Sequence, residues 1–229
     1  AGSSAAQTVT VTIVNDSDIE PDETVVLTLT NPSTGVTIGA NDMYTITIID
    51  DDTPIPTYTI DQINGVDANG VADSIGVYCK LEGILVGTNL RPSGVQITLW
   101  DGTAGIQVFA FNGLSNISNW NEGDQLRVIG TVNQFNGLLQ FEPDSAEAIS
   151  GSFTLPTPTV VTSLDESTES SLVRINNVTL VDPSQWTNSG SGFNVDITDG
   201  TTTFMMRIDA DVDIYGQPAP TGTFDVIGV

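Results

Sequence analysis

Short runs in which apolar and polar residues alternate recur along the chain, and the apolar spacing of an amphipathic helix is nearly absent. In the first 50 residues, three such runs cover residues 9–13, 24–29 and 44–48, each rich in Val, Ile, Leu and Thr. Side chains alternate between the two faces of a β-strand, so each run predicts a strand with one apolar face. Turn-forming Gly, Asn, Asp and Pro separate the runs. The sequence therefore predicts an all-β protein.

Two proline-containing segments divide the chain into three expected domains. Residues 50–56, DDDTPIP, carry prolines at alternate positions, which favour a stiff extended linker, and residues 151–158, GSFTLPTP, form a softer break. We therefore predict domains over residues 1–53, 54–150 and 151–229. Three strands with one apolar face make only half of a sandwich, which needs a second sheet, so the first domain is expected to be partial.

The second and third domains look like copies of one another. The matching segments at an offset of 98 residues are 100–103 with 198–201, 106–110 with 204–208, and 127–130 with 225–228. An earlier anchor, residues 81–84 against residues 175–178, lies at an offset of 94, which implies a loop of different length. A constant offset over several strand-like anchors indicates a duplicated module.

Each copy reads as a series of strands joined by turns. In the first copy, Asn136-Gly137 is a strong hairpin signal that leads into a fifth strand at residues 138–141. Five strands in this order suit a small OB-like barrel. The second copy stops at Val229, where its fifth strand would begin, so we expect a truncated barrel and a fragment of a longer protein.

The composition excludes several kinds of catalytic site. The chain has 29 acidic and 5 basic residues, one Cys and no His, with a formal net charge of −24. Sites that need an imidazole, an internal disulfide or a Cys-rich metal centre are therefore excluded. A pair of carboxylates for glycoside hydrolysis stays open, although every acid cluster lies in a turn or at a strand end. We expect no enzymatic activity, and no apolar stretch is long enough for membrane insertion.

Two acidic clusters lie at the ends of expected strands in the first domain. One is the segment 15–23, NDSDIEPDE, and the other is the triple aspartate 50–52. Carboxylates that converge repel one another unless a cation neutralises them, and oxygen ligands favour a hard cation such as Ca²⁺. The alternative is that these acids only solubilise loop ends, with Glu20-Pro21 starting a turn.

Residues 11–23, 25–29 and 44–52 together resemble the C-terminal half of a Calx-beta domain, an immunoglobulin-like sandwich known in sodium–calcium exchangers and bacterial adhesins. In calcium-binding members of this family, the acidic loop and the terminal Asp run coordinate Ca²⁺ together. The resemblance implies a calcium site whose ligands are Asp16, Glu20, Glu23, Asp50, Asp51 and Asp52. The expected fold class is therefore a partial immunoglobulin-like (Calx-beta) sandwich followed by two OB-like five-stranded barrels, the second truncated.

Residues 58–83, 89–92, 122–124 and 134–138 resemble OB-like modules of large secreted bacterial multidomain proteins, some of which also carry nuclease domains. Alternation places Trp100, Phe109 and Phe111 on the outward face of the second and third strands of the barrel, where OB folds commonly bind ligands. Aromatic rings there can stack on bases or sugars. The alternative is that the rings cover the open side of the barrel or pack against a neighbouring module.

Charge distinguishes between the ligands that this face suggests. Residues 57–229 contain 20 acidic and 5 basic residues, a net charge of −15, whereas binding of a nucleic-acid backbone needs clustered Lys and Arg. Thr198, Arg207 and Asp209 replace the three aromatic residues in the second copy. Nucleic acid is therefore disfavoured, and a neutral glycan is the ligand that avoids the charge penalty.

Together these features predict a non-catalytic structural or adhesion-type segment of a secreted bacterial surface protein, stabilised by Ca²⁺. Its expected partners are a cell-surface molecule or glycan and the flanking domains of the same parent chain. The alternative is an accessory module that binds a ligand for a secreted hydrolase or nuclease, with glycan favoured over nucleic acid.

Overall fold

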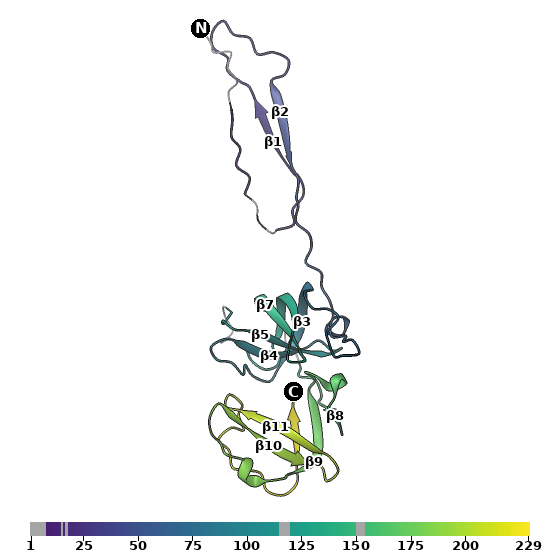
Figure 1. The fold of residues 1–229 in the computed structure, drawn as a ribbon. Coiled ribbons are helices and arrows are strands. Elements are labelled where there is room, and N and C mark those ends of the chain that lie inside the picture. Colours follow the sequence, from purple (N-terminus) through teal and green to yellow (C-terminus); the bar gives the residue numbers. More distant parts are fainter. Residues whose placement is uncertain (1–7, 15, 17, 115–119, 150–153) are drawn as a thin grey trace. The chain divides into compact units, whose positions relative to one another are not determined.

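The computed structural model describes residues 8–14, 16, 18–114, 120–149 and 154–229 (Figure 1). Strands make up nearly all of its regular structure, and the described residues include only three short 3₁₀ helices. The prediction of an all-β protein is confirmed. The chain forms two compact units, residues 1–54 and residues 55–229. Within the described residues, no helix is long and apolar enough to cross a bilayer.

The first unit contains a two-stranded antiparallel sheet made of β1 (Glu23–Thr28) and β2 (Met43–Ile48). These strands lie where two of the three alternating runs predicted them. The strand predicted at residues 9–13 is not formed, and these residues have no regular structure. A strand needs a paired neighbour to satisfy its backbone, and alternation alone does not supply one.

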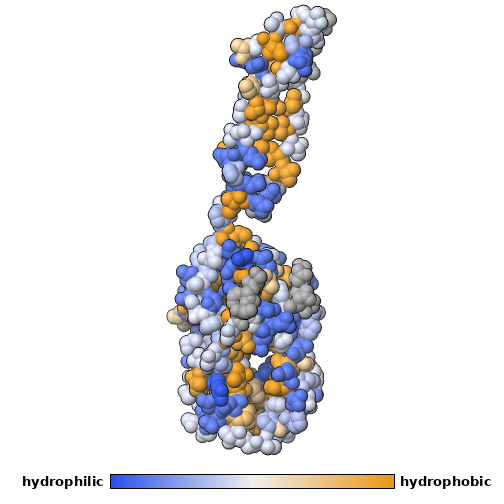
Figure 2. Space-filling view, turned by 180° about the vertical axis from the view of Figure 1, so that it is seen from behind, coloured by the Kyte–Doolittle hydropathy of each residue, from blue (hydrophilic) through white to orange (hydrophobic). Residues whose placement is uncertain are grey.

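The first unit also lacks a core among its described residues. Val25 lies opposite Ile46 on one face of the hairpin, and both are only half-buried. None of the described residues of this unit is fully buried. Figure 2 shows the resulting apolar surface as orange patches on this part of the chain. A two-stranded sheet with an exposed apolar face is marginal on its own.

The first part of the second unit is a closed five-stranded barrel. Its strands are β3 (Tyr78–Val86), β4 (Val95–Trp100), β5 (Gly105–Ala110), β6 (Gln125–Phe135) and β7 (Leu138–Ile149), in the order β3-β4-β5-β7-β6. Strand β7 closes the barrel because it pairs antiparallel with β6 and parallel with β5. Asn136 and Gly137 join β6 to β7 with φ values of 52° and 93°, so the predicted hairpin turn is confirmed.

Alternate residues of the five strands fill the barrel. The residues predicted to point inward on β4 and β5, such as Ile97 and Val108, are buried, and the Cys79 thiol is buried beside them. One end of the barrel is covered by the 3₁₀ helix η1 (Ile60–Gln62), whose Ile60 is fully buried in the same core. The largest fully buried side chain of the core is Phe141 of β7.

The second part of this unit repeats four of the five strands. They are β9 (Val173–Leu180), β10 (Gly192–Thr198), β11 (Thr203–Asp209) and β12 (Phe224–Gly228), in the order β11-β10-β9-β12, and the short β8 (Thr159–Val160) pairs with β9. The register agrees with the predicted offsets, since Gly130 pairs with Cys79 and Gly228 pairs with Val173. Among the described residues, no strand occupies the place that β7 takes in the first barrel.

This second part has its own core, which includes Ile175, Val195, Ile197 and Phe204. Trp186, which follows the 3₁₀ helix η4 (Pro183–Gln185), packs edge-on against Phe193 with the ring centroids 5.6 Å apart. Another 3₁₀ helix, η3 (Glu166–Thr168), lies between β8 and β9. The predicted domain break at residues 150–151 falls in a segment outside the described residues, and both barrels belong to one compact unit.

Candidate functional site

The acidic loop of the first unit lies beside the triple aspartate. The backbone N–H of Glu20 donates a hydrogen bond to Asp50 Oδ2 at 3.1 Å, and the N–H of Asp50 donates to Asp22 Oδ1 at 3.3 Å. The antiparallel pairing of β1 with β2 produces this arrangement, because the start of β1 lies opposite the end of β2. The two acidic segments are therefore side by side, as the positions of the strand ends predicted.

A small cavity of about 70 Å³ lies between the two segments. All six residues that the resemblance implied as calcium ligands line it: Asp16, Glu20, Glu23, Asp50, Asp51 and Asp52. Asp18, which was not among the implied ligands, also lines the cavity.

The carboxylates in this cluster raise one another's pKa. Repulsion from Asp16, and then from Glu23, raises the pKa of Glu20. Burial, together with repulsion from Asp50 and its neighbours, raises the pKa of Asp52. An added proton or cation would relieve this repulsion.

The carboxylate oxygens in this structure bind backbone groups instead of converging on a common point. Asp50 Oδ1 accepts a hydrogen bond from the N–H of Asp52 at 3.3 Å, and Asp16 Oδ1 accepts one from the N–H of Asp18 at 2.9 Å. In the described residues, no three Asp, Glu or Cys side chains are arranged to hold a metal ion. The donor chemistry suits Ca²⁺, but the cluster is open, so binding would require the side chains to rotate inward.

The predicted aromatic platform is divided between the two ends of the β4–β5 ladder. Trp100 lies opposite Gly105 at one end, whereas Phe109 lies opposite Gln96 toward the other. Four residues of strand separate Trp100 from Gln96, which corresponds to roughly 13 Å. The structure therefore brings Phe109 and Phe111 together and leaves Trp100 apart from them.

Arg91 occupies the space above the two phenylalanines. Its guanidinium carbon lies 4.5 Å from the ring centroid of Phe111 and 5.5 Å from that of Phe109, within the range of a cation–π interaction. Its Nε is buried without a hydrogen-bond partner. This role of Arg91 could not be predicted from the sequence, because only the folded loop before β4 brings it over the rings. Even so, residue Phe111 is 73% exposed.

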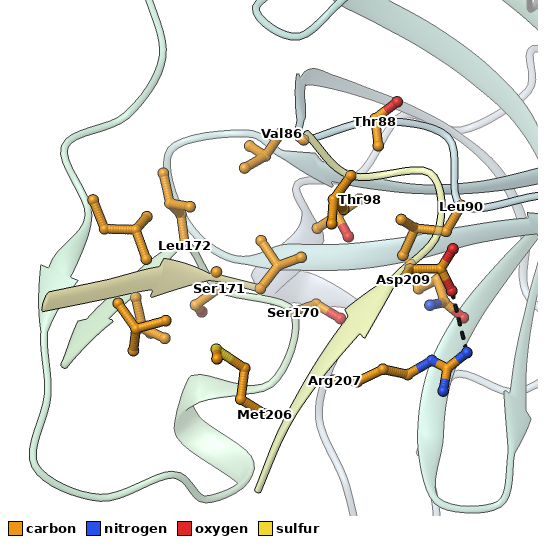
Figure 3. Close-up of a pocket in the computed structure, with 18 of the residues that line it drawn as sticks. Val86, Thr88, Leu90, Thr98, Ser170, Ser171, Leu172, Met206, Arg207 and Asp209 are labelled. Atoms are coloured by element: carbon orange, nitrogen blue, oxygen red, sulfur yellow. Dashed lines mark hydrogen bonds and ion pairs between the residues drawn. The ribbon is translucent and has the colours of Figure 1, made fainter. Parts of the chain in front are cut away.

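A second and larger cavity, of about 1140 Å³, lies in the second unit. Figure 3 shows Met206 and Arg207 of β11 on one side, Ser170 to Leu172 beside them, and Val86 and Thr88 of the first barrel. Arg207 Nη2 interacts with Asp209 Oδ2 at 3.4 Å at its margin. This cavity was not predicted from the sequence, although the expected lack of a strand in the second barrel was a signal for it.

The two barrels are joined by close backbone packing next to this cavity. The side chain of Glu169 accepts a hydrogen bond from the backbone N–H of Leu139 in β7 at 3.0 Å. The carbonyl oxygen of Ser170 lies 1.7 Å from the point where a Cβ on Gly105 would be, so only glycine fits at residue 105. Burial raises the pKa of Glu169, although the hydrogen bond from Leu139 acts in the opposite direction.

The structure defines an all-β protein with one closed five-stranded barrel and one open sheet of the same strand order. No family model and no curated protein matches the chain. One solved structure, described as "Structural mimicry for functional antagonism", is 8% identical with a TM-score of 0.32, and the match covers 64% of this chain and 78% of that one. Another, described as "Molecular basis for abrogation of activation of pro-inflammatory cytokines", is 12% identical with a TM-score of 0.33, covering 67% and 95%. Likeness at this level supports no conclusion about function.

Proposed function

We propose that the chain is a non-catalytic structural segment of adhesion type from a secreted bacterial surface protein. In this proposal a partial Calx-beta-like sandwich precedes two OB-like barrels, and the barrels act as a spacer. The observation that carries the proposal is the tight junction between the barrels. Gly105 and Ser170 approach through their backbones, and Glu169 binds the backbone of Leu139. A junction built from backbone contacts leaves little freedom between modules, which suits a spacer.

Unfolding of the full chain tests this role of the junction. The Gly105→Val side chain would overlap the Ser170 carbonyl, so this variant should lose any coupling between the barrels. We expect the two barrels to unfold in one shared transition in the unchanged chain and in two separate transitions in the variant. Hydrogen exchange of the β7 and β9 amides monitors each barrel. Gly113→Val is the matched control, because a Cβ there meets no atom within 4 Å. Separate transitions in the unchanged chain would contradict the proposal.

Ca²⁺ binding by the acidic cluster is part of the same proposal. The support is that all six residues line one small cavity and that their mutual repulsion raises the pKa of Glu20 and Asp52. When bound, Ca²⁺ would supply the positive charge that offsets this repulsion. Asp50 has a central place in this cluster, since its side chain accepts hydrogen bonds from both acidic segments.

A glycan-binding accessory role is the second candidate function. It is favoured by the exposed Phe111, because OB folds bind oligosaccharides and an exposed aromatic ring can stack on a sugar. A glycan array compared between the unchanged chain and Phe111→Ala tests this candidate. Phe135→Ala is the control, since Phe135 is also an exposed phenylalanine of the same barrel. Equal array signals for the chain and Phe111→Ala would exclude the candidate.

A further inference from the structure

Arg91 differs from the other arginines of the chain in its partners. Arg127, Arg174 and Arg207 each form an ion pair with an Asp or Glu side chain, whereas Arg91 forms none with any described residue. Its Nε is also the one buried side-chain nitrogen or oxygen of the described residues that lacks a hydrogen-bond partner. An unsatisfied buried donor costs stability, so folding alone does not account for an arginine at this position.

The loop that carries Arg91 is held in place by the side chain of Asn89. Asn89 Oδ1 accepts hydrogen bonds from the N–H of Arg91 at 3.2 Å and from the N–H of Gln96 at 2.8 Å. Asn89 Nδ2 donates to the carbonyl oxygen of Arg91 at 3.0 Å and to that of Gly94 at 3.1 Å. These four bonds fix the loop through its backbone, so the Arg91 guanidinium is positioned by the loop and takes no part in closing it.

Gly94 allows the Arg91 side chain to lie against the end of β5. A Cβ on Gly94 would lie 2.7 Å from Arg91 Nε and 2.6 Å from the carbonyl oxygen of Ala110. From this position the guanidinium stacks over Phe109 and Phe111. Stacking uses the face of a guanidinium and leaves the N–H groups at its edge free to bind. The two terminal nitrogens of Arg91 have no described partner and are not among the buried unpaired atoms, so they are accessible to a ligand.

The groups around the guanidinium match a sugar that carries a carboxylate. Arginine binds a carboxylate through two parallel hydrogen bonds from its planar fork. The exposed Phe111 can stack on the apolar face of a sugar ring. Gln96 lies opposite Phe109 in the β4–β5 ladder, and its side-chain amide has no partner among the residues that the structure describes. An amide both donates and accepts hydrogen bonds, as recognition of sugar hydroxyls requires.

We propose that Arg91, Phe111 and Gln96 form a binding site for an acidic sugar, in which the carboxylate of a uronic or sialic acid binds the Arg91 guanidinium. This inference rests on the glycan-binding candidate function and specifies its ligand class. One unpaired guanidinium suits one carboxylate, whereas a nucleic-acid backbone requires several clustered cations. The site belongs to the first barrel only, because Arg207 and Asp209 replace the two phenylalanines in the second and pair with each other at 3.4 Å.

Titration of the full chain with matched acidic and neutral sugars tests the ligand class. The probes are sialyllactose against lactose, and trigalacturonate against its methyl ester. In calorimetry we expect the acidic member of each pair to bind saturably and at least about tenfold more tightly than the neutral one. The NMR signal of the Arg91 Nε–H should shift during the titration. Equal affinity within each pair would overturn this inference and leave the glycan-binding candidate standing, whereas binding of no sugar would exclude both.

Substitutions separate the arginine fork from charge alone. Arg91→Lys keeps the charge but loses the planar fork, so it should weaken binding of the acidic sugars at least about tenfold, as should Arg91→Gln. Lys80→Gln is the matched control, because Lys80 lies in β3 of the same barrel and also has no ion pair with a described residue. It should bind as the unchanged chain does.

Three outcomes would overturn the assignment. The first is an equal loss of binding in Lys80→Gln, which would indicate charge without a defined site. The second is full binding by Arg91→Lys. The third is binding of a single-stranded oligothymidylate as tightly as the acidic sugars with the same shift of the Arg91 signal, which would assign the guanidinium to phosphate. If the Arg91 variants melt at a lower temperature, the shift of this signal in the unchanged chain decides the question.

Discussion

Ile60 donates its backbone N–H to Asp101 Oδ2 at 2.6 Å, which links two residues that are 41 positions apart. The other oxygen of Asp101 accepts hydrogen bonds from the side chain of Thr103 at 2.6 Å and from its N–H at 2.9 Å. One carboxylate therefore holds both the β4–β5 turn and the helix η1 that covers the end of the barrel. Asp199, the equivalent residue 98 positions later, binds only its own turn, through the N–H groups of Thr201 and Thr202.

The two aspartates should therefore differ in their effect on stability. Asp101→Ala removes hydrogen bonds to three separate residues and leaves the N–H of the buried Ile60 without its partner, which we expect to cost about 2–3 kcal/mol. Asp199→Ala removes only exposed turn bonds, so its expected cost is smaller. Denaturant unfolding of the full chain measures both. Equal losses would contradict the clamping role of Asp101.

Asp101 should also make the first barrel sensitive to acid. Burial acts to raise its pKa, but the hydrogen bonds from Thr103, Ile60 and Ala104 together outweigh burial and lower it. Because the folded pKa lies below the unfolded value of about 3.9, the stabilisation is complete above about pH 4 and is lost as pH falls through the folded pKa. The stability difference between the chain and Asp101→Asn should therefore shrink as the pH falls below about 4. A difference that does not change with pH would refute this.

Glu169 should have the opposite dependence on pH. Burial raises its pKa in the folded chain, so the folded state holds a proton that the unfolded state has already released. Stability should therefore increase as pH falls through the folded pKa, and the gain should be complete near the unfolded value of about 4.3. Glu169→Gln keeps an oxygen that can accept from Leu139 and should remove this dependence. Hydrogen exchange at the Leu139 amide, measured against pH in both chains, checks the prediction.

Calcium should stabilise the first unit only if the acidic cluster is intact. Titration of the chain with CaCl₂ in a calorimeter should give saturable heat, and Asp50→Asn should weaken the binding at least tenfold because Asp50 contacts both acidic segments. Asp42→Asn is the matched control, since Asp42 is an exposed acid of the same unit that does not line the cavity. Identical titrations in chain and Asp50→Asn would rule out the site.

Features that depend on local sequence could be predicted, and features that depend on contacts between segments distant in the sequence could not. Alternation located β1 and β2, and Asn136-Gly137 located the β6–β7 hairpin. The segment 9–13 has the same alternation but no paired strand, so the prediction there was wrong. Strand pairing is a tertiary property, and a single run of residues does not encode the presence of its partner.

The candidate sites also contain some features that the sequence predicted and others that it did not. The two acidic segments were correctly expected to meet, because both adjoin the ends of paired strands. The aromatic face was only partly right, since the register separates Trp100 from Phe109, and the stacking of Arg91 depends on the path of a loop. The ion pairs between strands also could not be predicted from the repeat. Arg127 binds Glu82 in the first barrel, whereas Asp225, at the equivalent position in the second, binds Arg174, which corresponds to Lys80 and not to Glu82.

The distance distribution between the two barrels shows whether their junction is rigid. Spin labels would be placed at the exposed Ala148 in β7 and Ser184 in η4, with the buried Cys79 replaced by Ala. We expect one narrow distribution for this chain and a broad one after Gly105→Val, which disrupts the contact with Ser170. A distribution that is already broad before that substitution would contradict the proposal that these barrels form a spacer.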